Sequence, residues 1–218
     1  MSGTDVVRLV RELRERTGAG MMDCKKALLE HDNDIEKAVA WLREKGMAGT
    51  AKKSGRVTSE GIIATYVHPG NNLGVLVEVN IETDFAARNE DFIEFARDCA
   101  MQIAAMNAKW VKREDVPAEA IEAEREIVRR QALNEGKPER IVDRIVEGRM
   151  SKFYSENCLM EQTFVKDESK TMEELRKELS ARLGENIVVR RFVRYQLGEG
   201  LEKRQDDFAA EVANMAGV

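Results

Sequence analysis

The chain has 218 residues, of which 43% are hydrophobic and 34% are charged, so it can form a core and should also have long solvated helical faces. Its net charge of -5 argues against a general nucleic-acid-binding protein, a class that is usually basic. Because no apolar run approaches the ~18 residues of a membrane helix and the N-terminus has no basic, apolar signal, we expect a soluble, cytoplasmic protein with no membrane contact.

Residues 1–48 have the pattern of a small three-helix bundle. Apolar residues recur at helical spacing in three stretches, which are separated at Thr17–Gly20 and by a polar loop. We expect Asn33 to cap the third helix with Glu36 in the reciprocal position, and Gly46 to end that helix. A bundle of about 40 residues is marginally stable alone. It is therefore interpreted as a partner-docking module rather than an enzyme.

Residues 49–58 are interpreted as a flexible, basic linker that leads into the first part of an α+β core, residues 59–115. Two β-rich stretches, 62–67 and 75–79, predict an antiparallel hairpin with a turn between them. Asn89 should cap the helix that follows. One face of this helix is apolar and is expected in the core: Phe92, Phe95, Ala96, Cys99, Ala100 and Ile103.

The connection between this hairpin and the helix, Thr83–Asn89, is the most informative segment of the chain. It places an acid, Asp84, beside a large aromatic residue, Phe85. Connections run over the surface, whereas large apolar residues are usually buried. Two interpretations therefore stay open. Phe85 either folds back into the core, or it is exposed beside Asp84 and could disturb a metal or phosphate site on another molecule.

Residues 116–157 predict an antiparallel helical hairpin that projects from the core, with a turn at Gly136–Pro138. The numerous Glu and Arg residues of both arms are interpreted as solvated faces.

Residues 158–200 should complete the core. The stretch 158–169 is expected to be irregular, a helix should begin at Thr171 and stop at Gly184, and the alternation over Asn186–Leu197 predicts a strand. Residues 201–218 then predict a C-terminal helix module whose apolar stripe, with Phe208, packs either on a partner or on this chain's own core.

Catalytic equipment is sparse in the sequence. There is no phosphate-binding loop and no motif that suggests a nucleophile–base pair. Cys24, Cys99 and Cys158 lack metal-ligand spacing and are expected in the core, while His31 and His68 are expected on the solvated surface. We therefore expect a binding or regulatory protein that is not an enzyme and needs no cofactor.

The chain resembles the translation elongation factor Ts family along essentially its whole length. Five blocks occur in the family's order: Leu13–Leu28, Thr83–Asn89, Gly136–Met150, Phe164–Asp167, and Gly198–Gly200 followed by Asp207–Glu211. One departure is Ala86, where Val is usual. The resemblance implies an α+β fold with an N-terminal ubiquitin-associated-like three-helix bundle, an α+β core with an antiparallel sheet, a helical coiled hairpin and a C-terminal helix.

The resemblance also implies a function, that of a guanine-nucleotide exchange factor for elongation factor Tu in its GDP-bound and nucleotide-free states. Asp84 and Phe85 would intrude near the Mg²⁺–phosphate region of that partner, with no direct contact to nucleic acid. We expect Met21 or Met22 to pack within the bundle instead. The full set of residues implied to bind the partner is Thr83, Asp84, Phe85, Asn89, Arg14, Met21, Met22, Val165, Lys166 and Phe208.

Two further expectations stay open at this point. Long members of the family carry a duplicated core, and this chain lacks one copy of the middle segment, which leaves a homodimer open. The alternative function, from another class, is a ubiquitin-associated-like helical scaffold that binds nascent chains or another protein. The Asp84–Phe85 pair discriminates between the two functions, because a pure scaffold does not need it.

Overall fold

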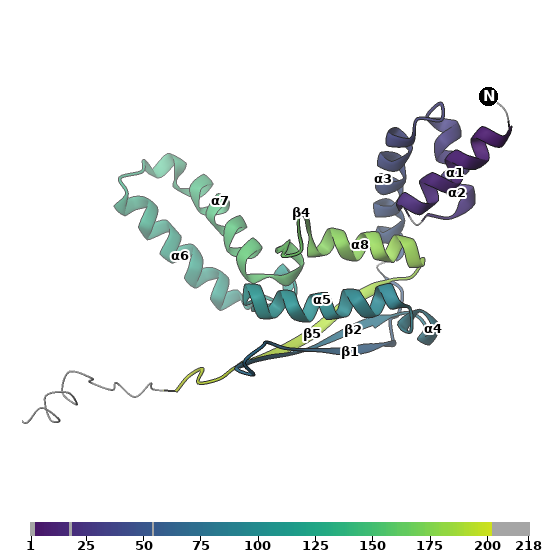
Figure 1. Ribbon diagram of the computed structural model, residues 1–218. Coiled ribbons are helices and arrows are strands. Elements are labelled where there is room, and N and C mark those ends of the chain that lie inside the picture. The colour runs from purple at the N-terminus through teal and green to yellow at the C-terminus, as the bar shows by residue number, and fades with distance from the viewer. Residues whose placement is uncertain (1–2, 18, 54, 202–218) are drawn as a thin grey trace, which may run out of the picture.

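The computed structural model describes residues 3–17, 19–53 and 55–201 of the chain (Figure 1). The fold is α+β, as predicted. A helical bundle at the N-terminus and a helical hairpin project from opposite ends of a core that is built from a small sheet and the helices packed on it (Figure 1). Within the described ranges, no helix has the length and apolar character needed to cross a membrane.

The N-terminal bundle consists of three helices, as predicted from the apolar spacing. Its own small core is separate from the main core and contains apolar side chains from each helix: Leu13, Cys24, Ala27, Leu28, Ala38 and Leu42. The helices are α1 (Gly3–Thr17), α2 (Met21–Glu30) and α3 (Ile35–Lys53).

Two predicted boundaries of α3 are wrong. Asp34, not Asn33, caps the helix, because its Oδ1 accepts a hydrogen bond from Lys37 N at 3.1 Å. Asn33 instead adopts φ 63° and donates its N–H to Leu28 O at 2.7 Å, so it closes the preceding helix. At the other end, α3 continues through Gly46 to Lys53, and the first half of the expected linker is helical. An internal glycine costs a helix only about 1 kcal/mol, and the alanines that follow it favour helix.

The core contains a three-stranded antiparallel sheet in the order β1-β2-β5, which confirms the predicted hairpin and the predicted C-terminal strand. β1 (Glu60–Val67) pairs with β2 (Leu73–Ile81), which pairs with β5 (Ile187–Gln196). Helix α5 (Glu90–Met106) covers one face of the sheet, and α8 (Met172–Leu183) lies over α5 as a further layer (Figure 1). The predicted apolar face of α5 is buried.

The helix boundaries in the core follow the predicted signals. Asn89 Oδ1 accepts a hydrogen bond from Asp91 N at 2.9 Å and caps α5. Thr171 and Glu174 form a capping box at the start of α8, and Gly184 ends that helix with φ 79°.

The stretch 158–169 is not irregular, contrary to prediction. It forms the 3-10 turn η2 (Leu159–Glu161) and a small hairpin of β3 (Thr163–Phe164) and β4 (Asp167–Thr171). The buried amide of Gln102 organises this hairpin, because its Nε2 donates to Thr163 O and its Oε1 accepts from Val165 N, each at 3.0 Å. This contact joins segments that are about 60 residues apart in sequence, so local patterning could not reveal it.

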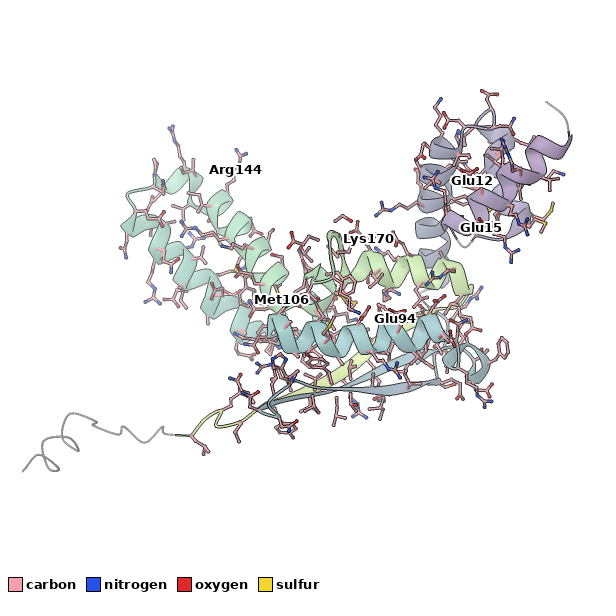
Figure 2. The ribbon with its side chains drawn as sticks, in the orientation of Figure 1. Glu12, Glu15, Glu94, Met106, Arg144 and Lys170 are labelled. Carbon is pink, nitrogen blue, oxygen red and sulfur yellow. The ribbon has the colours of Figure 1, made fainter. Side chains whose placement is uncertain are left out.

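The predicted helical hairpin is confirmed as α6 (Ala118–Asn134) and α7 (Glu139–Asn157). Charged side chains cover its outside, as Arg144 illustrates (Figure 2). Solvation is not their whole role, because three ion pairs also join the two arms. Exposed pairs of this kind each contribute about 1 kcal/mol or less. The pairs are Arg125–Glu147 at 2.7 Å, Arg129–Asp143 at 2.5 Å and Arg149–Glu135 at 2.8 Å.

The cysteines and histidines complete the comparison with the sequence predictions. Cys24, Cys99 and Cys158 are buried, as expected, and burial raises the pKa of the Cys158 thiol to about 11. His68 is exposed. The prediction of a solvated His31 is wrong, since its ring is half-buried edge-on to Trp41, at 6.1 Å between centroids. His31 ends α2 and so faces the helix that returns beside it.

Candidate functional site

The segment after β2 folds into a single short helix, α4 (Asp84–Ala87), which fixes where each side chain of the segment points. Thr83 caps this helix, because its Oγ1 accepts a hydrogen bond from Ala86 N at 3.2 Å. Ala86 and Ala87 are buried against the core. Since residues on opposite sides of one turn cannot both face inward, Phe85 is directed away from the core.

Phe85 is 85% exposed, which makes the interpretation of a core phenylalanine wrong. Asp84, beside it, is also exposed and forms an ion pair with Arg88 at 3.1 Å. An exposed pair four residues apart on a helix contributes only about 0.3–0.5 kcal/mol. The carboxylate can therefore exchange Arg88 for another partner at small cost. An acidic side chain and an aromatic side chain are thus adjacent and solvent-exposed at one end of the core.

The two polar residues that flank α4 have local structural roles. Thr83 caps α4, and Asn89 caps α5 directly after it. The segment is thus held at both ends by caps, which limits the freedom of Asp84 and Phe85 relative to the core. A preorganised pair of this kind can contact a partner with little loss of conformational entropy.

The predicted residues of the bundle, Arg14, Met21 and Met22, are all exposed. Met21 is 61% exposed and Met22 is 74% exposed, so the expectation that one of them packs within the bundle is wrong. The two methionines begin α2, directly after the loop that ends at Gly20. Adjacent exposed methionines form a small, adaptable apolar patch, a type of surface that suits protein binding.

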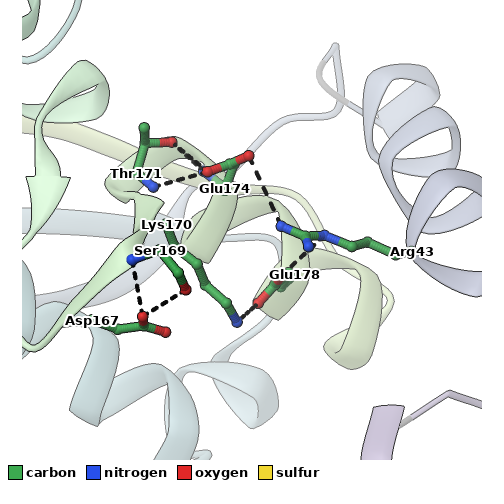
Figure 3. Close-up of polar contacts among 7 residues, drawn as sticks. All are labelled: Arg43, Asp167, Ser169, Lys170, Thr171, Glu174 and Glu178. Atoms are coloured by element: carbon green, nitrogen blue, oxygen red, sulfur yellow. Dashed lines mark hydrogen bonds and ion pairs between the residues drawn. The ribbon is translucent and has the colours of Figure 1, made fainter. Parts of the chain in front are cut away.

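The bundle is attached to the core through α3 and α8. Arg43 of α3 lies 3.5 Å from Glu178 and 3.9 Å from Glu174, and Lys170 contacts the other oxygen of Glu178 at 2.6 Å (Figure 3). This junction places the bundle at the same end of the core as α4, away from the helical hairpin (Figure 1). No sequence pattern distinguishes Arg43, which is one of many charged residues on a helix face.

Val165 and Lys166 form the turn between β3 and β4. The Lys166 ammonium is 2.6 Å from the carboxylate of Asp98, and this hydrogen bond raises the pKa of the lysine. Asp98 lies almost buried on α5, so Lys166 neutralises it and is held in place. The Val165 side chain is exposed beside it. The structure thus brings Lys166 together with Asp98, a partner that sequence reasoning missed.

The last predicted site residue, Phe208, and the predicted C-terminal helix lie outside the described residues. Across 3–17, 19–53 and 55–201, no group of three His, Cys, Asp or Glu side chains could hold a metal ion. The exposed apolar and charged groups of α2, α4 and the β3–β4 turn instead form surfaces suited to contact with another protein.

Comparison with known proteins places this arrangement in a family. The family model described as "Elongation factor TS" matches residues 15–199. The chain is 62% identical over 205 residues to an elongation factor Ts of Desulforamulus reducens, which covers 94% of each chain. It is 60% identical over 204 residues to that of Heliobacterium modesticaldum and 59% identical over 206 residues to that of Carboxydothermus hydrogenoformans, with 94% of this chain and 95% of each relative covered. The chain and these relatives are therefore similar in length.

Proposed function

The chain belongs to the elongation factor Ts family of translation elongation factors, and from that membership we propose that it is a guanine-nucleotide exchange factor for elongation factor Tu. The observation that carries the proposal is the exposed pair Asp84–Phe85 on a helix capped by Thr83. The pair would enter the partner near its Mg²⁺–phosphate region and favour the geometry that the partner has without nucleotide.

Such a mechanism makes and breaks no covalent bond, so the protein would be neither an enzyme nor dependent on a cofactor. A nucleotide held at nanomolar affinity has about 12 kcal/mol of binding free energy. Coupling between two ligands is reciprocal, so a protein that binds empty elongation factor Tu more tightly than the GDP-bound form weakens GDP by the same factor. The exchange factor must therefore bind both states and differ in its affinity for them.

The other surfaces would supply binding that is the same in both states. We assign this role to Arg14, Met21 and Met22 of the bundle, to the Val165–Lys166 turn, and to the C-terminal residues around Phe208. Uniform binding raises the occupancy of the complex without accelerating release within it. A translation factor with this partner would act in the cytoplasm.

We also propose that the protein forms a homodimer. What supports this is the face of the sheet opposite α5, where apolar side chains of all three strands are exposed, and the single copy of the core in a chain of this length. A second copy would cover these side chains. Sedimentation equilibrium tests the dimer independently of exchange. The exposed residues on this face are Ile63, Val67, Leu76, Val193 and Tyr195.

The competing function is a helical scaffold that uses the bundle to bind nascent chains or another protein. The exposed Met21 and Met22 are compatible with it, whereas the exposed Phe85, on a capped helix outside the bundle, has no role in it. Release of a fluorescent GDP from purified elongation factor Tu decides between the two. Acceleration by catalytic amounts of this protein supports the exchange factor, and binding without acceleration supports the scaffold.

A further inference from the structure

The base of α4 is bonded to a residue from a distant part of the chain, Glu185. This residue lies in the loop between α8 and β5, 102 positions after Thr83. Thr83 N donates to Glu185 Oε2 at 3.0 Å, and Thr83 Oγ1 donates to Glu185 Oε1 at 2.7 Å. The carboxylate thus binds the backbone and the side chain of the same threonine.

This pair of bonds determines how Thr83 caps the helix. A hydroxyl has one hydrogen to donate, and here it goes to Glu185. A lone pair of the same oxygen is then left to accept from Ala86 N, at 3.2 Å. Glu185 therefore fixes the rotamer of the capping residue, and the cap fixes the turn that carries Asp84 and Phe85.

Glu185 is itself held in place. The buried Ser180 donates its Oγ to Glu185 O at 2.5 Å, and Gly184 provides the left-handed turn that brings the loop to this point. The next residue, Asn186, donates its N–H to Glu82 Oε1 at 2.6 Å. Two carboxylates thus connect the segment after β2 to the loop after α8. Glu82 of the segment accepts from Asn186 of the loop, and Glu185 of the loop accepts from Thr83 of the segment.

We propose that Glu185 is a positioning residue for nucleotide exchange, which acts through Thr83 to hold Asp84 and Phe85 in the orientation in which they meet the partner. The inference rests on the proposed function. Glu185 does not itself have to touch elongation factor Tu. Its loss should reduce the effect of the bound protein on GDP release more than it reduces binding.

The test compares Glu185→Ala, Glu185→Gln, Thr83→Val and the double variant Glu185→Ala/Thr83→Val with the wild-type full-length chain. The rate of labelled GDP release is measured over a range of protein concentrations, which separates the maximal rate from the half-saturating concentration. Arg182→Ala is the matched control, because it breaks an ion pair between α8 and Asp91, at 3.3 Å, without touching Thr83.

Glu185→Ala should lower the maximal rate of GDP release by about fivefold or more, because Asp84 and Phe85 would no longer be held in the orientation that accelerates release. The half-saturating concentration should stay within about twofold, because the other contacts with the partner remain. Glu185→Gln, which keeps one acceptor oxygen, should fall between. The further loss caused by Glu185→Ala should be smaller in the Thr83→Val background than in wild type, because Thr83→Val already removes one of the two bonds to Glu185 and leaves only that from Thr83 N. Equal maximal rates for Glu185→Ala and wild type, or additive losses in the double variant, would overturn the proposal.

A second measurement separates this inference from the proposed function. Hydrogen exchange of the amides of residues 83–87 in the isolated protein reports the cap directly. Glu185→Ala should reduce the protection of the Ala86 amide, and Arg182→Ala should not. If wild-type protein fails to accelerate GDP release, the proposed function is wrong, while lost protection would still support the positioning. Unchanged protection would overturn the positioning whatever the exchange rate.

Discussion

Phe85 and Phe92 are seven residues apart and have opposite environments. Phe85 is 85% exposed on α4, whereas Phe92 is completely buried on α5 between the helix and the sheet. Burial of a phenylalanine normally contributes strongly to folding, and exposure of one contributes almost nothing to it. The pair therefore supplies a matched comparison between a side chain that serves the fold and one that is free to serve a partner.

Phe85→Ala should slow nucleotide exchange without destabilising the protein. We expect the rate of GDP release to fall at least about tenfold, because an aromatic hot spot at an interface contributes about 2 kcal/mol or more. Its free energy of unfolding should change by less than about 0.5 kcal/mol, as for other surface substitutions. Phe92→Ala, the control, should lower it by about 3–5 kcal/mol. A large drop in the melting temperature of Phe85→Ala would contradict this prediction and indicate that the side chain packs in the core.

Asp84→Ala should also slow exchange, with little effect on thermal stability. Its carboxylate is exposed and, among the residues that the structure describes, is paired with Arg88, which is also exposed, so its removal leaves no buried charge behind. Arg88→Ala serves as the control, since it breaks the same ion pair and keeps the carboxylate. Exchange assays on both variants decide the point. If Arg88→Ala were as slow as Asp84→Ala, the ion pair rather than the acid would be responsible.

Met21→Ala/Met22→Ala should weaken binding to elongation factor Tu by about fivefold and leave the maximal rate of GDP release unchanged. These residues are assigned to binding that is the same in both nucleotide states of the partner. Both side chains are exposed, so the melting temperature should not move. Leu28→Ala, in the buried face of the same helix, should instead destabilise the bundle by about 2–5 kcal/mol. Calorimetric titration measures the affinity. Unchanged affinity for the double variant would remove the bundle from the interface.

Deletion of residues 201–218 should weaken binding to elongation factor Tu and leave the melting temperature of the isolated protein nearly unchanged. The expectation follows from the apolar stripe of this segment, which has Phe208 at its start and needs a cover. Calorimetry and a thermal melt of the truncated chain test the two halves. Unaltered affinity together with a destabilised fold would assign the segment to this chain's own core.

Acid should destabilise the sheet through Glu78. Arg190 and Arg191 each donate to its carboxylate at 2.7 Å, and these bonds lower its pKa from 4.5 to about 2. Between these values the unfolded carboxyl binds more protons than the folded one, so the stabilisation is complete above pH 4.5 and is lost as the pH falls toward about 2.

Denaturant unfolding of wild type and Glu78→Gln across that window measures this contribution. The wild-type free energy of unfolding should fall more steeply with acid, and the two proteins should converge near the lower end. Parallel curves would show that Glu78 does not supply the pH dependence.

The sequence predicted most of the fold because its boundaries are marked by local chemistry. Asn89, Thr171 and Gly184 each start or stop a helix through bonds to near neighbours, and the predicted elements begin and end there. The errors have two causes. The hairpin of β3 and β4 depends on the distant Gln102 amide, whereas α3 runs past Gly46 because an internal glycine costs a helix little.

The candidate site was predicted in part for the same reason. The Asp84–Phe85 pair was visible as an unusual dipeptide in a connection, but its exposure depends on Ala86 and Ala87 filling the inward side of α4. The bond from Glu185 joins residues far apart in sequence, and an acid after a helix stop has no distinguishing pattern. Sequence could propose which residues act, whereas the structure shows how they are held.

The central claim is that this protein favours nucleotide-free elongation factor Tu through the exposed pair on α4. Stopped-flow release of labelled GDP from elongation factor Tu, at saturating wild-type protein and at saturating Phe85→Ala, tests it most directly. The account predicts strong acceleration by wild type without GTP hydrolysis, and a maximal rate at least about tenfold lower for the variant, whose aromatic anchor is gone. No acceleration by wild type, or equal maximal rates for the two proteins, would contradict it.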